Sequence, residues 1–210
     1  QSYTFTSHPA LSIPLTTLTC QLLGVHERPA RKREWSRVFQ EITDLLVNEY
    51  GTPTLGNYKN PIAEIVYIVL SAKTSEKLYQ TSYRRLIASF PSIEASARAE
   101  ASDIQSCISV GGFGRKRSVK IKNLAVRLVN ALGRNRQQAL RKMFPAELFC
   151  FLTALPEVGE KSALCVMMYS FGLDEFPVDA NIRRIAVRLG VLRKTLGHYN
   201  GQRRLPTVLP

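Results

Sequence analysis

The chain has 210 residues, 45% of them hydrophobic, which is enough for one large domain or two small lobes. Lysine and arginine number 29 against 16 acidic residues, so the net charge is +13. This excess favours a polyanionic partner, nucleic acid first and an anionic membrane surface second, with a merely basic soluble protein as the alternative. No apolar run reaches transmembrane length and no signal-peptide pattern opens the chain, which argues against a membrane protein.

The four cysteines lie far apart in the sequence and form no Cys-x-x-Cys pair: Cys20, Cys107, Cys150 and Cys165. This spacing is typical neither of a disulfide framework nor of a zinc site, so we expect no metal and a reducing intracellular compartment. Cys150 and Cys165 have apolar neighbours and are expected to be core thiols.

The predicted elements are helices throughout. Residues 1–30 have weak periodicity and are expected to form an irregular arm. A helical pattern then starts at Arg31 and ends at Gly51, and Pro61 opens a very apolar helix, "PIAEIVYIVLSA". Helices follow over 75–90, 92–98, 101–109, "VGGFGRKRSVKIKNLAVRLVNAL", 136–144 and 146–154. Because alternating strand patterns are nearly absent, the sequence predicts an all-α fold of about ten helices.

The segment "LPEVG" at 155–159 turns the chain between helix 146–154 and a second helix that begins near Glu160. This pattern predicts a helix–hairpin–helix over about 146–172. The first N–H groups of the second helix have no partner within it and carry the positive end of its dipole. We therefore expect a DNA phosphate to bind at Val158 and Gly159.

Two residues at successive helix starts could perform chemistry. Lys161 lies in the first turn of the hairpin's second helix, where the positive helix end favours a free, nucleophilic amine. Asp179 precedes "ANIRRIAVRLG", where it could stabilise a developing cation or take a proton from Lys161. On spacing alone, an exposed lysine and a helix N-cap are the ordinary interpretations of these two residues.

Three stretches carry a resemblance to a known family. "LPEVGEKSA…FPVDANIRRIAVRLG" resembles the signature of the helix–hairpin–helix DNA glycosylases, in particular the endonuclease III branch and its plant 5-methylcytosine glycosylases. "NPIAEIVYIVLSAKTS" and "GGFGRKRSVKIKNLA" are similar to two upstream segments of that branch. The match covers roughly residues 35–192.

The resemblance implies a base-excision repair enzyme with DNA glycosylase and AP lyase activities. Lys161 aligns with the lysine that attacks C1′ of a flipped-out nucleotide, and Asp179 with the aspartate that assists departure of the base. The expected substrate is double-stranded DNA with a damaged base, an oxidised pyrimidine first, or an abasic site. A monofunctional glycosylase for mismatched, deaminated or methylated bases, or a non-catalytic DNA-binding module, are the alternatives.

The resemblance also suggests further DNA contacts. Phe113 aligns with a side chain that wedges into the duplex, although packing at a helix start is an equal alternative. Arg115, Lys116 and Arg117 are expected to meet phosphates, with a solvated basic face as the alternative. Lys73 stands where the family has a glutamine that fills the gap left by the flipped base.

The family's organisation implies two lobes with the active-site cleft between them. The expected division is an arm (1–30), a helical barrel (58–175), and a second lobe built from 31–57 plus 176–210, whose completeness at the C-terminus the sequence leaves open. Many members carry a [4Fe–4S] cluster on a four-cysteine loop that is absent here, so no cofactor is expected in this chain. We expect a monomer that resides with DNA, in the nucleus or the nucleoid.

One position departs from the family pattern. Glu157 stands where the hairpin normally has its first glycine. If this position requires a positive φ, glutamate costs about 1–2 kcal/mol there. Its charge would also lie near the bound phosphate.

Overall fold

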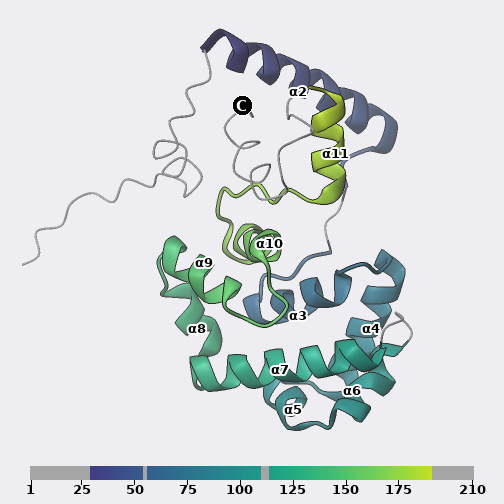
Figure 1. The fold of residues 1–210 in the computed structure, drawn as a ribbon, viewed down its shortest axis with the longest axis vertical. Coiled ribbons are helices and arrows are strands. Elements are labelled where there is room, and N and C mark those ends of the chain that lie inside the picture. The colour runs from purple at the N-terminus through teal and green to yellow at the C-terminus, as the bar shows by residue number, and fades with distance from the viewer. Residues whose placement is uncertain (1–28, 54–55, 110–113, 191–210) are drawn as a thin grey trace, which may run out of the picture.

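The computed structural model describes residues 29–53, 56–109 and 114–190, with side chains from residue 36 onward. All regular secondary structure in these ranges is helical, which confirms the all-α prediction. The described helices, drawn in Figure 1, are α2 (Pro29–Tyr50), α3 (Pro61–Ser71), α4 (Glu76–Ser89), α5 (Ile93–Arg98), α6 (Ala101–Ile108), α7 (Gly114–Leu132), α8 (Arg136–Arg141), α9 (Pro145–Thr153), α10 (Glu160–Phe171) and α11 (Ala180–Arg188).

Helix α3 is the centre of the larger hydrophobic core. Its start is defined by Asn60, whose side chain accepts hydrogen bonds from the N–H groups of Ile62 and Ala63, and by Pro61 in the first turn. From Ile65 to Leu70 no residue is more than 7% exposed, since α4, α7, α8 and α10 surround the helix. A helix that is apolar on all sides needs such a covering, as the sequence pattern predicts.

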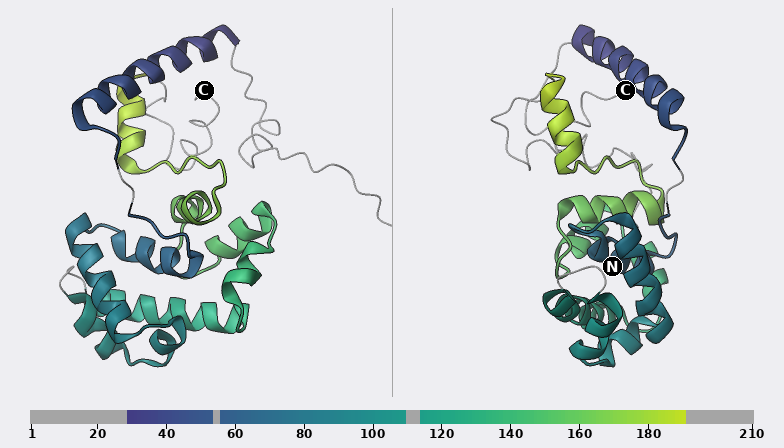
Figure 2. Two further views of the ribbon diagram at one scale, coloured as in Figure 1. Left: turned by 180° about the vertical axis from the view of Figure 1, so that it is seen from behind. Right: turned by 90° about the vertical axis from the view of Figure 1, so that its right-hand side faces the viewer.

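A second, smaller core lies at the other end of the molecule. Val178 and Ala186 are buried there, and Phe39 of α2 packs against them. Figures 1 and 2 show α2 and α11 side by side, away from α5, α6 and α7. The apolar residues of α2 that follow Phe39 are poorly covered by the described residues, since the Leu46 side chain is 52% exposed. The lobe boundaries given above remain predictions.

The segment 56–60 leads into α3 and is held by hydrogen bonds from two helices, α3 and α10. The Glu64 carboxylate of α3 accepts hydrogen bonds from Asn57 Nδ2 (2.5 Å) and from the N–H of Tyr58 (2.7 Å). From α10, Ser170 Oγ donates to the Tyr58 carbonyl at 2.7 Å. These bonds fix the segment against the α3–α10 pair, which is also the pair that carries Glu64 and Lys161.

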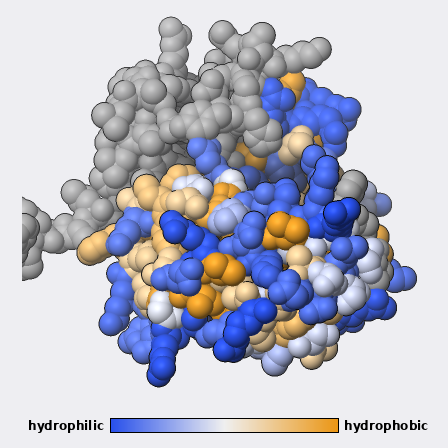
Figure 3. All heavy atoms as spheres, turned by 60° about the horizontal axis from the view of Figure 1, so that its bottom comes forward, coloured by the Kyte–Doolittle hydropathy of each residue, from blue (hydrophilic) through white to orange (hydrophobic). Residues whose placement is uncertain are grey.

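Hydrophilic and hydrophobic residues are mixed on the face shown in Figure 3, where the hydrophobic ones form groups between the hydrophilic ones. Within the described ranges, no helix combines the length and the apolar character that crossing a membrane requires.

Candidate active site and nucleic-acid interface

The predicted helix–hairpin–helix is formed by α9 and α10 with a turn over 154–159. Glu157 has a φ of 66°, in the left-handed region that favours glycine, so the side chain costs about 1–2 kcal/mol at this position. Its carboxylate forms an ion pair with Lys120 of α7, with Nζ and Oε2 2.5 Å apart. The pairing directs the negative charge toward α7.

The two residues expected to bind phosphate through this turn differ from each other. Val158 is 4% exposed, and its N–H already donates to the Leu155 carbonyl at 3.3 Å, so it stabilises the turn instead of offering a free donor. Gly159 is exposed and forms the N-cap of α10 without a side-chain cap. The N–H groups that follow it in the first turn of α10 are therefore available to an anion.

Lys161 and Asp179 occupy the N-terminal ends of successive helices, and both side chains are partly buried. Asp179 is the N-cap of α11: Oδ1 accepts hydrogen bonds from the N–H groups of Asn181 (2.9 Å) and Ile182 (2.8 Å). Both capping bonds use Oδ1, which leaves Oδ2 for another partner. The ordinary capping role and a chemical role are thus compatible in one carboxylate.

The buried Cys165 thiol shows that these charged groups lie close together. It follows Lys161 by one turn of α10. Burial raises the pKa of this thiol, the nearby Lys161 lowers it through its charge and a hydrogen bond, and the charges of Glu64 and Asp179 raise it. The charges of Lys161, Asp179 and Glu64 therefore all lie within electrostatic range of this one buried thiol.

Glu64 is a residue of this cluster that the sequence analysis did not single out. It is fully buried, and its pKa is raised by burial, with the Tyr58 and Asn57 hydrogen bonds and the charge of Lys161 opposing the rise. The available signal was a single acid in the otherwise apolar helix "PIAEIVYIVLS". A buried carboxylate beside a lysine is the kind of perturbed group that marks functional sites.

A cluster of tyrosines lies within electrostatic range of Glu64. The Tyr58 ring lies 5.0 Å from Tyr67 and 4.9 Å from Tyr83, centroid to centroid. Burial raises the pKa of Tyr67 and of Tyr83 to about 12, so both phenols stay neutral at ordinary pH. The Glu64 carboxylate thus accepts its backbone hydrogen bond from a residue whose ring belongs to this aromatic cluster.

The basic residues at the start of α7 separate into two groups. Arg115 and Lys116 are exposed, and their side chains form no hydrogen bond or ion pair with another described residue, as phosphate contacts require. Arg117 differs from the expectation: its guanidinium is partly buried and donates to the Leu70 carbonyl, to Thr74 Oγ1 and to the Ala72 carbonyl.

The start of α7 therefore joins two loops that are distant in sequence. Arg117 binds the turn between α3 and α4, which carries Lys73, and Lys120 one turn later binds the hairpin through Glu157. Lys73 is exposed and has a φ of 54°. The α3–α4 turn, the first turns of α7 and the hairpin thus form one continuous edge. Phe113, the predicted wedge, lies outside the described residues.

The described cysteines do not fit a metal cluster. Cys107, Cys150 and Cys165 belong to three different helices, and the described residues contain no group of three or more histidine, cysteine or acidic side chains arranged to hold a metal. Cys165 is buried as expected, but Cys150 is exposed, because it lies on the outer face of α9.

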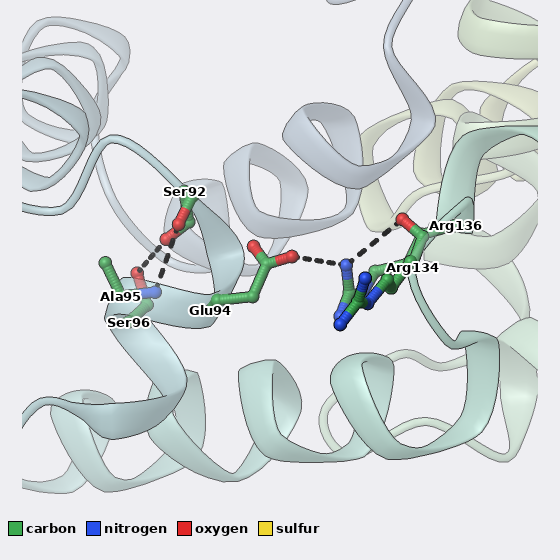
Figure 4. A network of polar contacts seen from close by, with 6 residues as sticks. All are labelled: Ser92, Glu94, Ala95, Ser96, Arg134 and Arg136. Atoms are coloured by element: carbon green, nitrogen blue, oxygen red, sulfur yellow. Dashed lines mark hydrogen bonds and ion pairs between the residues drawn. The ribbon is translucent and has the colours of Figure 1, made fainter.

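A cavity of about 630 Å³ lies elsewhere, between α3, α4 and the 134–138 segment. Arg136, which is buried, forms an ion pair with the partly exposed Glu94 at the wall of this cavity (Figure 4). Neither Lys161 nor Asp179 lines it, so this cavity is separate from the candidate active site.

The α9–turn–α10 unit in an all-helical fold defines a helix–hairpin–helix protein. Lys161 in the first turn of α10 and Asp179 as the N-cap of α11 lie beside this motif in the sequence. Residues 66–205 match the HhH-GPD superfamily of base excision DNA repair proteins, and the chain belongs to this family. Among curated relatives, an Arabidopsis thaliana protein provisionally assigned as a DNA glycosylase is 36% identical over 131 residues, covering 62% of this chain and 45% of the relative. Endonuclease III of Sulfolobus acidocaldarius is 31% identical over 139 residues, covering 65% of this chain and 60% of that protein.

The fold is also found in solved structures. A non-covalent complex of endonuclease III with DNA matches with a TM-score of 0.69 at 20% identity, covering 83% of this chain and 78% of that one. This likeness shows the shared fold. The chain spans only part of these two curated relatives, 45% and 60% of their lengths.

Proposed function

We propose that the protein is a base-excision repair enzyme that removes a damaged base from double-stranded DNA and then cleaves the abasic site. The observation that carries the proposal is that Lys161 and Asp179 lie at two successive helix N-termini and that the charges of both act on the buried Cys165 thiol. A nucleophilic amine beside a carboxylate is the arrangement that this chemistry needs. Membership of the HhH-GPD family supports it.

In the proposed reaction, the Lys161 amine forms a bond to C1′ of the flipped nucleotide. The bond from C1′ to the base breaks, and its electron pair leaves with the base. Asp179 Oδ2 stabilises the positive charge that develops on the sugar and accepts a proton from the lysine. The sugar ring then opens to a Schiff base, and loss of a proton from C2′ breaks the C3′–O bond, which nicks the strand.

DNA is the proposed partner, held along the edge formed by the α3–α4 turn, the first turns of α7 and the N-terminus of α10. Arg115 and Lys116 would neutralise phosphates there, and the α10 N–H groups would bind another. An oxidised pyrimidine is the first substrate to test. We propose that the chain acts as a monomer in the compartment that holds DNA, and that this part of the protein needs no cofactor.

Borohydride trapping on a duplex with an abasic site tests the proposal. Borohydride reduces a Schiff base to a stable amine, so the wild type should form a covalent protein–DNA adduct. Lys161→Ala should form none, whereas Lys142→Ala, which changes an exposed lysine at the end of α8, should match the wild type.

Two other outcomes of this experiment would each contradict the proposal in a different way. Base release without an adduct would replace the proposal with a monofunctional glycosylase. DNA binding without either activity would indicate a non-catalytic module. A panel of duplexes with oxidised, deaminated, methylated and mismatched bases, run with Lys161→Ala in parallel, then identifies the base.

A further inference from the structure

The Arg117 guanidinium lies against the C-terminal end of α3. Nη1 donates to the Leu70 carbonyl at 3.1 Å and to Thr74 Oγ1 at 2.6 Å, and Nη2 donates to the Ala72 carbonyl at 2.6 Å. The last carbonyls of a helix lack donors within the helix and carry the negative end of its dipole. Arg117 therefore caps α3 from a helix more than 40 residues further along the chain.

The contacts of Arg117 enclose one residue, Lys73. Its φ of 54° places a non-glycine side chain in the left-handed region, which costs about 1–2 kcal/mol. Such a conformation persists only where its surroundings enforce it. Arg117 binds Ala72, the residue before Lys73, and Thr74, the residue after it. The N–H of Thr74 also donates to the Ser71 carbonyl at 3.2 Å, which closes the turn.

Arg117 is poorly placed to bind a phosphate itself. Its side chain is partly buried between α7 and the turn, and burial lowers its pKa. Three hydrogen bonds within the protein already use both terminal nitrogens. Arg115 and Lys116, its exposed neighbours, have no such contacts with described residues.

We propose that Arg117 is a positioning residue that holds the α3–α4 turn, and with it Lys73, in the conformation that contacts the gap in the duplex. The proposal rests on the proposed function, because it takes DNA as the ligand of this edge. Arg117 thereby determines preference for an abasic or base-flipped site, whereas Arg115 and Lys116 supply affinity for any duplex. Arg117→Lys should hold the turn less firmly, since a single ammonium does not span both sides of Lys73 with fixed, planar donors.

The first test needs no DNA. Amide hydrogen exchange of residues 71–75 is compared in the folded wild type, Arg117→Gln and Lys116→Gln. Arg117→Gln should accelerate exchange at Thr74, and Lys116→Gln should leave it unchanged. Unchanged exchange in Arg117→Gln overturns the proposal, whatever the protein does with DNA. Thr74→Ala, which removes one partner of the guanidinium, provides a milder variant if Arg117→Gln does not fold.

The second test measures Kd by fluorescence anisotropy, at several salt concentrations, for a duplex with a stable abasic-site analogue and for the undamaged duplex. Arg117→Gln and Arg117→Lys should each reduce the preference for the analogue by about fivefold or more, without changing the slope of log Kd against log salt. Lys73→Ala should reduce the preference in the same way and should also lower that slope, because it removes an exposed ammonium from the DNA-contacting turn. Lys116→Gln should instead lower that slope by about 0.9 and leave the preference unchanged. A lowered slope in Arg117→Gln, or wild-type behaviour of Arg117→Lys, overturns the proposal.

The two tests separate this proposal from the proposed function. Faster exchange at Thr74 in a protein whose wild type does not bind DNA would support the structural role of Arg117 and overturn DNA as the ligand. Faster exchange together with an unchanged preference would overturn the link between the turn and site recognition.

Discussion

Lys120 Nζ lies 2.5 Å from Glu157 Oε2, and this pair joins the first turns of α7 to the hairpin turn. Glu157 has a φ of 66°, where a glycine would be free of strain. Both side chains are well exposed, 45% and 38%, so the pair contributes at most about 1 kcal/mol to stability. The ion pair therefore offsets at most part of the backbone strain at this position.

The backbone strain at Glu157 can be measured directly by two substitutions. Glu157→Ala removes the ion pair and keeps the left-handed residue, whereas Glu157→Gly removes both the pair and the strain. We expect the free energy of unfolding of the Glu157→Gly variant to be about 1 kcal/mol higher than that of the Glu157→Ala variant. Urea denaturation of the two variants measures this difference. Equal stability would show that the turn tolerates a side chain here without strain.

The charge of Glu157 should weaken DNA binding. Glu157→Gln keeps the size and the backbone conformation but removes a negative charge close to the N-terminus of α10, and it frees Lys120. We expect a tighter Kd for duplex DNA and a steeper salt dependence, because one more ammonium can displace counterions from DNA. Fluorescence anisotropy at several salt concentrations measures both. Glu100→Gln, which frees Lys122 on a different face of α7 from Lys120, is the matched control; an equal effect there would assign the change to net charge alone.

The two roles of Asp179 can be separated. Asp179→Asn keeps an oxygen that accepts from the N–H groups of Asn181 and Ile182, so the unfolding free energy should stay near that of the wild type. Asp179→Ala loses this cap and should cost about 1 kcal/mol. Both variants should lower the rate of base release or adduct formation by about a hundredfold or more, because both lose the carboxylate. Asp174→Asn, an exposed neighbour in the same segment, should retain activity. Full activity in Asp179→Asn would reduce Asp179 to a helix cap.

Glu64 should make stability depend on pH. Its pKa is raised above the ordinary value of 4.5, so the folded state binds this proton more tightly than the unfolded state does. The stabilisation is fully present below pH 4.5 and is lost as pH rises through the folded pKa. Glu64→Gln removes this dependence, and unfolding free energy should fall less steeply with rising pH than in the wild type.

Glu94 supplies the control of opposite sign for that experiment. Its pKa is lowered by a backbone hydrogen bond and by the charge of Arg136, so its contribution is present above the unfolded pKa and is lost as pH falls. Glu94→Gln should therefore lose stability relative to the wild type as pH rises toward 4.5, and the difference should stay constant above that pH. Denaturant unfolding from about pH 2 to 8 in all three proteins checks both signs. Identical slopes in the wild type and in Glu64→Gln would contradict the raised pKa.

Several features of the site could be predicted because they depend on neighbours in sequence. The apolar period of about 3.6 residues and the prolines at positions 61 and 145 define helix faces and helix starts. Lys161 in the first turn of α10 and Asp179 as the N-cap of α11 follow from the same local rules. Helix ends were less well predicted: α8 ends at Arg141, three residues before the expected end.

The sequence by itself determined that this protein is helical, that it contains a hairpin, and which lysine and aspartate begin the following helices. The tertiary structure alone decided which polar groups meet. Arg117 reaches carbonyls 45 and 47 residues away, Lys120 reaches Glu157 37 residues away, and Glu64 is brought beside Lys161 by the packing of α3 on α10. The physical reason is that helix formation depends on hydrogen bonds four residues apart, whereas side-chain pairing depends on how whole helices pack. For that reason Arg117 looked in the sequence like one more phosphate contact, and in the fold it holds the turn that carries Lys73.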